Sequence, residues 1–329
     1  MKKLKYSQGI LDAFNYLLEN HKEFFVIGQG LWSPWYVGST MKDLDKKFGK
    51  ERVIDSPVSE IGVTGAAIGA SIAGYRPLVV HPRVDFMLLA VDQIVNQAAK
   101  WRHMFGGKSS APATFRAIIN RGGEQGAQHS QSLHSWFAHI PGLKVVMPYS
   151  PKDARDLLIS SVLADDPVVF MDDRWLYDEE ELVENDFELI DLKKVKPQIV
   201  KEGNQITLVG IGHSTKIIMD AIGSLQNVDA EIIDLRLLNP IDFSVIIDSV
   251  KKTGRLLVVD GDWSSCGIAS EIISSVCEQM NPKNFKSKPV KITLTDAPAP
   301  TSKPLEDIYY INPKTVANKI LDSINEKID

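Results

Sequence analysis

Cysteine is scarce in this sequence of 329 residues, which contains only Cys266 and Cys277. The two residues are not spaced as a CxxC pair, and no cluster of histidines accompanies them. The sequence therefore indicates neither a disulfide framework nor a metal site. We expect both cysteines to be buried free thiols.

Long hydrophobic runs and blocks of like charge are also missing. No apolar run reaches the length of a membrane span, and the N-terminal Met-Lys-Lys-Leu-Lys leads into an amphipathic pattern, not into the apolar core of a signal peptide. The net charge of -5 is small, and no basic block suggests binding to nucleic acid or to an anionic membrane. These absences favour a cytoplasmic protein with neither kind of partner.

The sequence does contain a repeated alternation of short apolar runs and amphipathic segments. Predicted strands at 24–27, 52–55, 76–80, 114–119, 143–147 and 167–171 precede a charged, irregular stretch, and further strands follow at 206–210, 230–235, 255–260 and 290–294. Helices are predicted between the later strands and at 313–324. This pattern predicts the α/β class, with two parallel-sheet, three-layer domains at 1–172 and 204–329 joined by a linker at 173–203.

A helix rich in small residues follows the predicted strand at 52–55, and Glu60 stands at its start. Gly62, Gly65 and Gly69 recur at intervals of three and four, which places them on one helical face. Each glycine costs a helix about 1 kcal/mol relative to alanine. The pattern therefore predicts the close approach of a partner chain or a flat ligand, although a tightly packed core helix after a surface glutamate would look the same.

Two loops at the expected carboxyl edge of the first sheet carry side chains suited to chemistry. Residues 81–86 follow a predicted strand, where open α/β sheets usually bind ligands, and Phe86 there could bind a ligand or open a helix as a core aromatic. A glycine-rich loop at 120–128 ends at His129, which could donate a proton or simply be solvated.

A third loop, Gly28-Gln-Gly-Leu-Trp-Ser33, nearly matches the glycine fingerprint for dinucleotides. Ser33 replaces the third glycine and Pro34 crowds the turn, so a nicotinamide enzyme is only a minor alternative.

Five motifs occur in order along nearly the whole chain. They are Asp55-Ser-Pro-Val-Ser-Glu-Ile-Gly62, Gly74-Tyr-Arg-Pro77, Asp92-Gln-Ile-Val-Asn96, Gln128-His-Ser-Gln131 and Pro141-Gly-Leu-Lys-Val-Val146. Together they resemble the β subunit of thiamine-diphosphate-dependent 2-oxo acid dehydrogenases, the E1 component of the pyruvate, branched-chain and acetoin type. The resemblance implies a transketolase-like pyrimidine-binding domain followed by a transketolase C-terminal domain.

The resemblance also implies a thiamine diphosphate site shared with an α subunit, which would hold the magnesium ion and the diphosphate. Val58, Glu60 and Phe86 would contact the cofactor, with Glu60 bonded to the pyrimidine nitrogen N1′ and Phe86 packed on the ring. Glu60 and His129 would be the catalytic residues, His129 lying near the reacting carbonyl. No metal ligand is expected in this chain.

The implied activity is oxidative decarboxylation of a 2-oxo acid with acyl transfer to a lipoyl acceptor. The implied assembly is α2β2, with a second copy of this chain and a lipoyl acyltransferase as a further partner. Gln29-Gly30 stand where the family has acidic residues, and Pro82-Arg83 also depart from it. These departures leave room for the small chain of a split transketolase-like carboligase, and a non-catalytic assembly subunit is a third hypothesis.

Overall fold

The computed structural model describes residues 1–326, which form two compact units. The first unit contains residues 1–121 and 136–195, and the second contains residues 122–135 and the chain from residue 196 onward. No helix in the described part of the chain is both long enough and apolar enough to cross a lipid bilayer.

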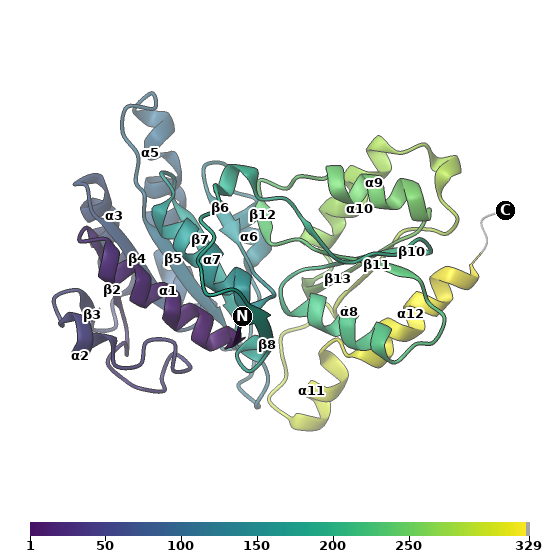
Figure 1. The fold of residues 1–329 in the computed structure, drawn as a ribbon, viewed down its shortest axis with the longest axis horizontal. Coiled ribbons are helices and arrows are strands. Elements are labelled where there is room, and N and C mark those ends of the chain that lie inside the picture. The colour runs from purple at the N-terminus through teal and green to yellow at the C-terminus, as the bar shows by residue number, and fades with distance from the viewer. Residues whose placement is uncertain (327–329) are drawn as a thin grey trace. The chain divides into compact units, whose positions relative to one another are not determined.

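The first unit is built on six parallel strands in the order β6-β7-β5-β4-β2-β3 (Figure 1). Their bounds are β2 Phe24–Gly28, β3 Val53–Asp55, β4 Arg76–His81, β5 Thr114–Ile119, β6 Lys144–Val146 and β7 Val168–Asp173. Strands β5 and β7 are buried along their whole length. Burial on both faces explains why these strands appear in the sequence as mainly apolar runs without alternation.

Helices cover both faces of this sheet. They are α1 (Tyr6–Asn20), α2 (Leu44–Phe48), α3 (Glu60–Ile72), α4 (Val84–Met87), η1 (Leu88–Ala90), η2 (Gln93–Ala98), α5 (Ala99–Met104), α6 (His134–Ala138, which crosses the boundary between the two units' segments) and α7 (Pro151–Leu163). The connections β3 to β4 and β4 to β5 cross the sheet in one direction, whereas β6 to β7 crosses in the other. Because such crossovers are right-handed, α3 and residues 84–104 lie on one face and α7 lies on the other, packed on α1.

The helical segment over residues 84–104 is broken into several pieces. It consists of α4, a 3-10 turn, the π-helix η2 and α5, and the π-helix packs against α3.

The charged segment at 173–203, predicted to be irregular, contains short regular elements, so that expectation is wrong. They are η3 (Arg174–Leu176), β8 (Glu180–Val183), η4 (Leu192–Lys194) and β9 (Gln198–Lys201). Strand β8 pairs antiparallel with β1 (Lys2–Lys5), and Lys3 forms an ion pair with Glu180. The partner strand lies almost the whole first unit away in sequence, so a local pattern could not predict the pairing.

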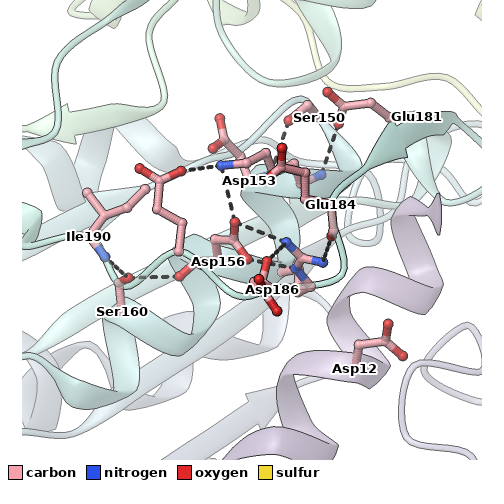
Figure 2. A network of polar contacts seen from close by, with 12 residues as sticks. Asp12, Ser150, Asp153, Asp156, Ser160, Glu181, Glu184, Asp186 and Ile190 are labelled. Carbon is pink, nitrogen blue, oxygen red and sulfur yellow. Dashed lines mark hydrogen bonds and ion pairs between the residues drawn. The ribbon is translucent and has the colours of Figure 1, made fainter. Parts of the chain in front are cut away.

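A polar network ties the chain after β8 to α7 (Figure 2). Ser150 caps α7 by accepting from the Asp153 N–H at 3.1 Å. The buried guanidinium of Arg155 pairs with Asp156, with 2.7 Å between Nε and Oδ1, and donates to the carbonyls of Glu184 and Asp186 at 3.2 and 3.0 Å. This segment is therefore an ordered part of the first unit.

The second unit has a five-stranded sheet in the order β14-β13-β10-β11-β9. The remaining elements are β10 Ile206–Gly210, α8 His213–Gly223, β11 Ala230–Asp234, β12 Leu237–Asn239, α9 Ser244–Thr253, β13 Leu256–Trp263, α10 Ile268–Gln279, η5 Pro282–Asn284, β14 Val290–Leu294, α11 Lys303–Tyr309 and α12 Pro313–Asn325. Helices α8 and α12 cover one face and α9 and α10 the other (Figure 1). The predicted fold class is confirmed, with β9 as an additional antiparallel edge strand.

Both cysteines are exposed free thiols, so the expectation that they are buried is wrong. Cys266 lies in the turn before α10 with a φ of 57°. Cys277 lies on α10 among residues that face outward. The local sequence around each residue is mixed, so a general preference of cysteine for burial was a poor guide.

Candidate functional site

A cleft of about 250 Å³ opens at the carboxyl ends of β2, β3 and β4 in the first unit. Parallel strands bring their carboxyl ends to one edge, so the loops that follow them converge there. The cleft is lined by residues of those loops and of the first turn of α3, namely Gly28, Gln29, Ser56, Pro57, Ser59, Glu60, Val63, Val79, Val80, His81 and Pro82.

Glu60 is the first residue of α3, and its side chain is half-buried in this cleft. The backbone N–H groups of a first helical turn carry partial positive charge, which favours a carboxylate at that place. Glu60 therefore lies in the cleft because it begins the helix that follows β3, as the sequence predicts.

The loop after β2 is fixed by Asp55 at the end of β3. The Asp55 carboxylate accepts from the backbone N–H of Gly30 at 2.7 Å, and the indole of Trp32 donates to the Val53 carbonyl at 2.8 Å. A Cβ on Gly30 would lie 2.2 Å from the Tyr36 ring, so only glycine fits there. Residues 29–43 form turns without a helix, which disfavours the dinucleotide interpretation of this loop.

His81 presents a neutral imidazole to the same cleft. Its side chain is buried, and its Nε2 lies 3.5 Å from the Thr64 hydroxyl on α3. Burial lowers the pKa of His81 to about 4, so the ring is uncharged at neutral pH. The sequence predicts that His81 lies in a ligand-binding loop, but nothing in it predicts that the side chain is buried.

The glycine face of α3 is open. A Cβ on Gly69 would meet no atom within 4 Å, one on Gly65 would meet only the Gln93 side chain at 3.6 Å, and one on Gly62 would meet the Ser59 hydroxyl at 3.0 Å. Ile61 beside them is 54% exposed. The three glycines predict that something packs closely against this face of α3. No part of the described chain does so, and the face is therefore free for another molecule.

The other predicted site residues are not among those that line this cleft. Val58 is 68% exposed in the loop before α3, and Phe86 is half-buried in α4; neither of them lines the cleft. His129 belongs to the segment of the second unit at 122–135.

The loop that carries His129 is tied to the second unit at both ends. The Glu124 N–H donates to the Glu306 carboxylate at 2.9 Å. At the other end, His134 Nε2 lies 2.9 Å from Asp260 Oδ1, and its Nδ1 lies 3.0 Å from the Ser132 hydroxyl. The His134 side chain is fully buried.

Two residues of the same edge went unnoticed in the sequence. Asn120 directly follows β5, and Arg174 directly follows β7. The available signal was a polar residue immediately after a buried parallel strand, the same signal that pointed to residues 81–86.

Comparison with known proteins gives matches to both units. The family model described as "Transketolase, pyrimidine binding domain" matches residues 2–179, and "Transketolase, C-terminal domain" matches residues 194–316. The β subunit of acetoin:2,6-dichlorophenolindophenol oxidoreductase from Bacillus subtilis is 38% identical over 290 residues, covering 87% of this chain and 83% of its own length. The pyruvate dehydrogenase E1 component subunit beta of Rickettsia bellii is 35% identical, covering 95% and 96%.

Among solved structures, a chain titled "Split gene transketolase, inactive beta4 tetramer" superposes with a TM-score of 0.75 and 19% identity, covering 99% of both chains. At that identity the match bears on the fold alone. The curated relatives are far more similar in sequence and match nearly end to end. This chain therefore belongs to the family of transketolase-fold β subunits that includes those of pyruvate dehydrogenase E1 and of the acetoin oxidoreductases.

Proposed function

We propose that this chain is the β subunit of a thiamine-diphosphate-dependent 2-oxo acid dehydrogenase E1 component, active only together with an α subunit. The main support is the position of Glu60, a carboxyl group at the mouth of a cleft, on the helix whose glycine face is open. The relatives that match over most of their length carry names of this enzyme class.

The cleft beside Glu60 is open to solvent on one side, as expected of a surface that another chain completes. Val63, Val79, Val80 and Pro82 give it an apolar lining beside Glu60. A half-site of this kind supports a cofactor shared between chains, with the diphosphate and the magnesium ion held by the α subunit.

Bound thiamine diphosphate supplies a carbon nucleophile that adds to the 2-oxo acid and takes up the electrons released with carbon dioxide. Glu60 would hold a proton at the pyrimidine nitrogen N1′, and the apolar lining would strengthen that coupling by lowering the local dielectric constant. Phe86 and the exposed Val58 would contact the cofactor, and His129 would donate a proton at the reacting oxygen. Proton transfer of this kind contributes typically about 10²–10⁴-fold to a rate.

The proposed assembly is α2β2, and its proposed acceptor is a lipoyl group on an acyltransferase. A second candidate function is a split transketolase-like carboligase, which passes its two-carbon or acyl unit to another aldehyde or sugar. The observation that favours this candidate is a pair of arginines beside the cleft, Arg83 and Arg174. A purely structural role is disfavoured because Glu60, Phe86 and His129 are all present.

The test is Glu60→Gln in the complex purified with its native α subunit. Turnover of a panel of 2-oxo acids with an artificial electron acceptor should fall by about 10²-fold or more, since the proton at N1′ would no longer be held by a carboxyl group. Size-exclusion chromatography should show an unchanged complex, because Glu60 makes no packing contact that glutamine could not replace.

The matched control is Glu19→Gln, the same substitution at an exposed glutamate on α1 that forms an ion pair with Lys47. It should leave turnover unchanged. Full activity of Glu60→Gln would eliminate the proposed role of Glu60. Tight binding of thiamine diphosphate to the isolated β chain, measured by calorimetry, would contradict the shared site.

A further inference from the structure

The backbone that leads to His129 turns several times through the left-handed region. Gly122, Gly123 and Gly126 have φ values of 75°, 67° and 74°, which glycine adopts without steric cost. Glu124 lies among them with a φ of 59°, a conformation that is unfavourable for a residue with a Cβ. A glycine at position 124 would avoid this strain, so the glutamate side chain itself needs a reason.

The Glu124 side chain caps the helix α11. That helix begins at Lys303, and its N-cap residue Ser302 forms no side-chain hydrogen bond that would cap it. Glu124 Oε1 instead accepts from the Lys303 N–H at 3.0 Å. In return, the Glu124 N–H donates to Oε1 of Glu306 on the same helix at 2.9 Å, and Glu306 is only 2% exposed. Two reciprocal hydrogen bonds to carboxylates, a strong kind of hydrogen bond, therefore join this loop to α11.

The helix α11 is in turn fixed to the sheet of the second unit. The hydroxyl of Tyr309, at the end of α11, donates to the Ala297 carbonyl at 2.7 Å, and the indole of Trp263 at the end of β13 donates to the same carbonyl at 3.0 Å. Just before α11, Thr301 packs so closely on Gly126 that a Cβ there would lie 2.4 Å from its methyl group. The loop is thus supported through α11 by the last residue of β13.

The two ends of the loop are held in different ways. His134 and Asp260, 2.9 Å apart at the downstream end, are both fully buried. Glu124 at the upstream end is exposed. His129 lies midway, five residues from Glu124 and five from His134. Removing a contact with α11 should therefore loosen the loop around His129 without unfolding the second unit.

We infer that α11 positions His129 for the reaction, with Glu306 and Glu124 as positioning residues, and this inference rests on the proposed role of His129 as a proton donor. A donor must lie within hydrogen-bond reach, about 2.6–3.2 Å, of the atom that receives its proton. A loop released at one end would hold His129 there for only part of the time. The loss affects the rate of the chemical step, so kcat should fall while KM changes little.

The first experiment measures hydrogen exchange by mass spectrometry in the complex with its native α subunit. Glu306→Leu removes the acceptor of the Glu124 N–H, so residues 122–129 should exchange about 10-fold faster than in the wild type. Glu306→Gln keeps an oxygen that can accept this hydrogen bond and should retain most of the protection. Glu124→Ala removes the other hydrogen bond from an exposed position, and we expect a smaller acceleration.

The matched control is Asp307→Leu, the same new side chain at the next residue of α11. Asp307 is exposed and forms an ion pair with Lys303 within the helix. This variant should exchange and turn over as the wild type does. Unchanged exchange of residues 122–129 in Glu306→Leu would overturn the inference.

The second experiment compares turnover of 2-oxo acids by single and double variants of the same complex. Glu306→Leu should lower kcat about 10-fold with little change in KM, and Glu306→Gln should restore most of it. If Glu306 acts through His129, adding Glu306→Leu to His129→Gln should cause no further loss, because two residues that act as a unit are not additive.

A further 10-fold loss in the double variant would place the effect of Glu306 elsewhere and overturn the inference. Full turnover by both Glu60→Gln and His129→Gln would instead overturn the proposed function, and with it the role of α11 in the reaction. The two failures are distinguishable, because the exchange of residues 122–129 reports whether α11 holds the loop regardless of the chemistry.

Discussion

At the carboxyl edge of the second unit's sheet, the Thr215 hydroxyl donates to Asp234 at 2.9 Å, and His134 lies 2.9 Å from Asp260. All four side chains are buried. The corresponding edge of the first unit also carries a carboxylate, a histidine and arginines, but there Glu60 and His81 line a cleft and Arg83 and Arg174 are half-buried.

The difference shows how two mainly parallel sheets come to serve different purposes. Parallel strands bring polar residues to the carboxyl edge in both units. In the second unit these residues form hydrogen bonds with one another and fix a loop, so their interactions contribute to the free energy of unfolding. In the first unit some of these residues line a cleft, where a ligand can reach them. Substitutions at the second edge should therefore lower stability, and substitutions at the first should mainly impair binding and turnover.

The largest effect on stability is expected from Asp260→Ala. This change leaves the fully buried His134 without its carboxylate at 2.9 Å, and breaking a buried pair typically costs about 3–5 kcal/mol. Hydrogen exchange followed by mass spectrometry should show lost protection in β13, while the strands of the first unit keep theirs.

The double variant His134→Leu with Asp260→Leu is the informative control for that change. Removing both partners leaves no unpaired imidazole, while the Ser132 hydroxyl and the Asp262 N–H each lose one hydrogen bond, so part of the lost stability should return. If Asp260→Ala left the protection of β13 unchanged, the second edge could not be regarded as a stability element.

His81 is the exception that sharpens the comparison, since it is buried although it lies at the open edge. Its pKa is about 4 in the folded protein, below the value of about 6.5 expected for the unfolded chain. Between these two values the unfolded chain binds more protons, so the folded state loses stability as the pH falls from about 6.5 to about 4. The loss should reach about 3 kcal/mol.

The measurement for His81 is urea unfolding at about pH 7 and about pH 4, comparing the wild type with His81→Gln, which carries no titratable group at that position. The variant should lose about 3 kcal/mol less than the wild type over this range. His139→Gln, at an exposed histidine, should behave as the wild type does. Identical pH dependence in the wild type and His81→Gln would show that the imidazole is solvated.

Local patterns in the sequence predicted most of this fold. The strands at 206–210 and 290–294 lie at their predicted bounds, and Glu60 begins a helix as expected. These elements are dictated by apolar periodicity, which is a local property. The pairing of β1 with β8 was missed because the two strands lie far apart in the sequence and only the rest of the fold brings them together.

The candidate site divides in the same way. Glu60 and the loop at 81–86 could be found because each follows a strand directly. The burial of His81 and the joining of Arg83 to Arg174 through Asn120 depend on which strands are neighbours. Strand order is set by packing over the whole sheet, and no short stretch of sequence contains it.

The smallest loss of stability that still distinguishes the second edge from the first is expected from Thr215→Val. Valine has nearly the shape of threonine but no hydroxyl, so the buried Asp234 loses a donor at 2.9 Å. Such a loss costs about 1–3 kcal/mol, and it should appear in the protection of β10 and β11 against hydrogen exchange. Thr215→Ser keeps the hydroxyl and should retain most of that protection. Turnover per folded complex should be unchanged in both variants. A loss of activity with intact protection against hydrogen exchange would instead place Thr215 in the reaction, and the two edges would then not differ in purpose.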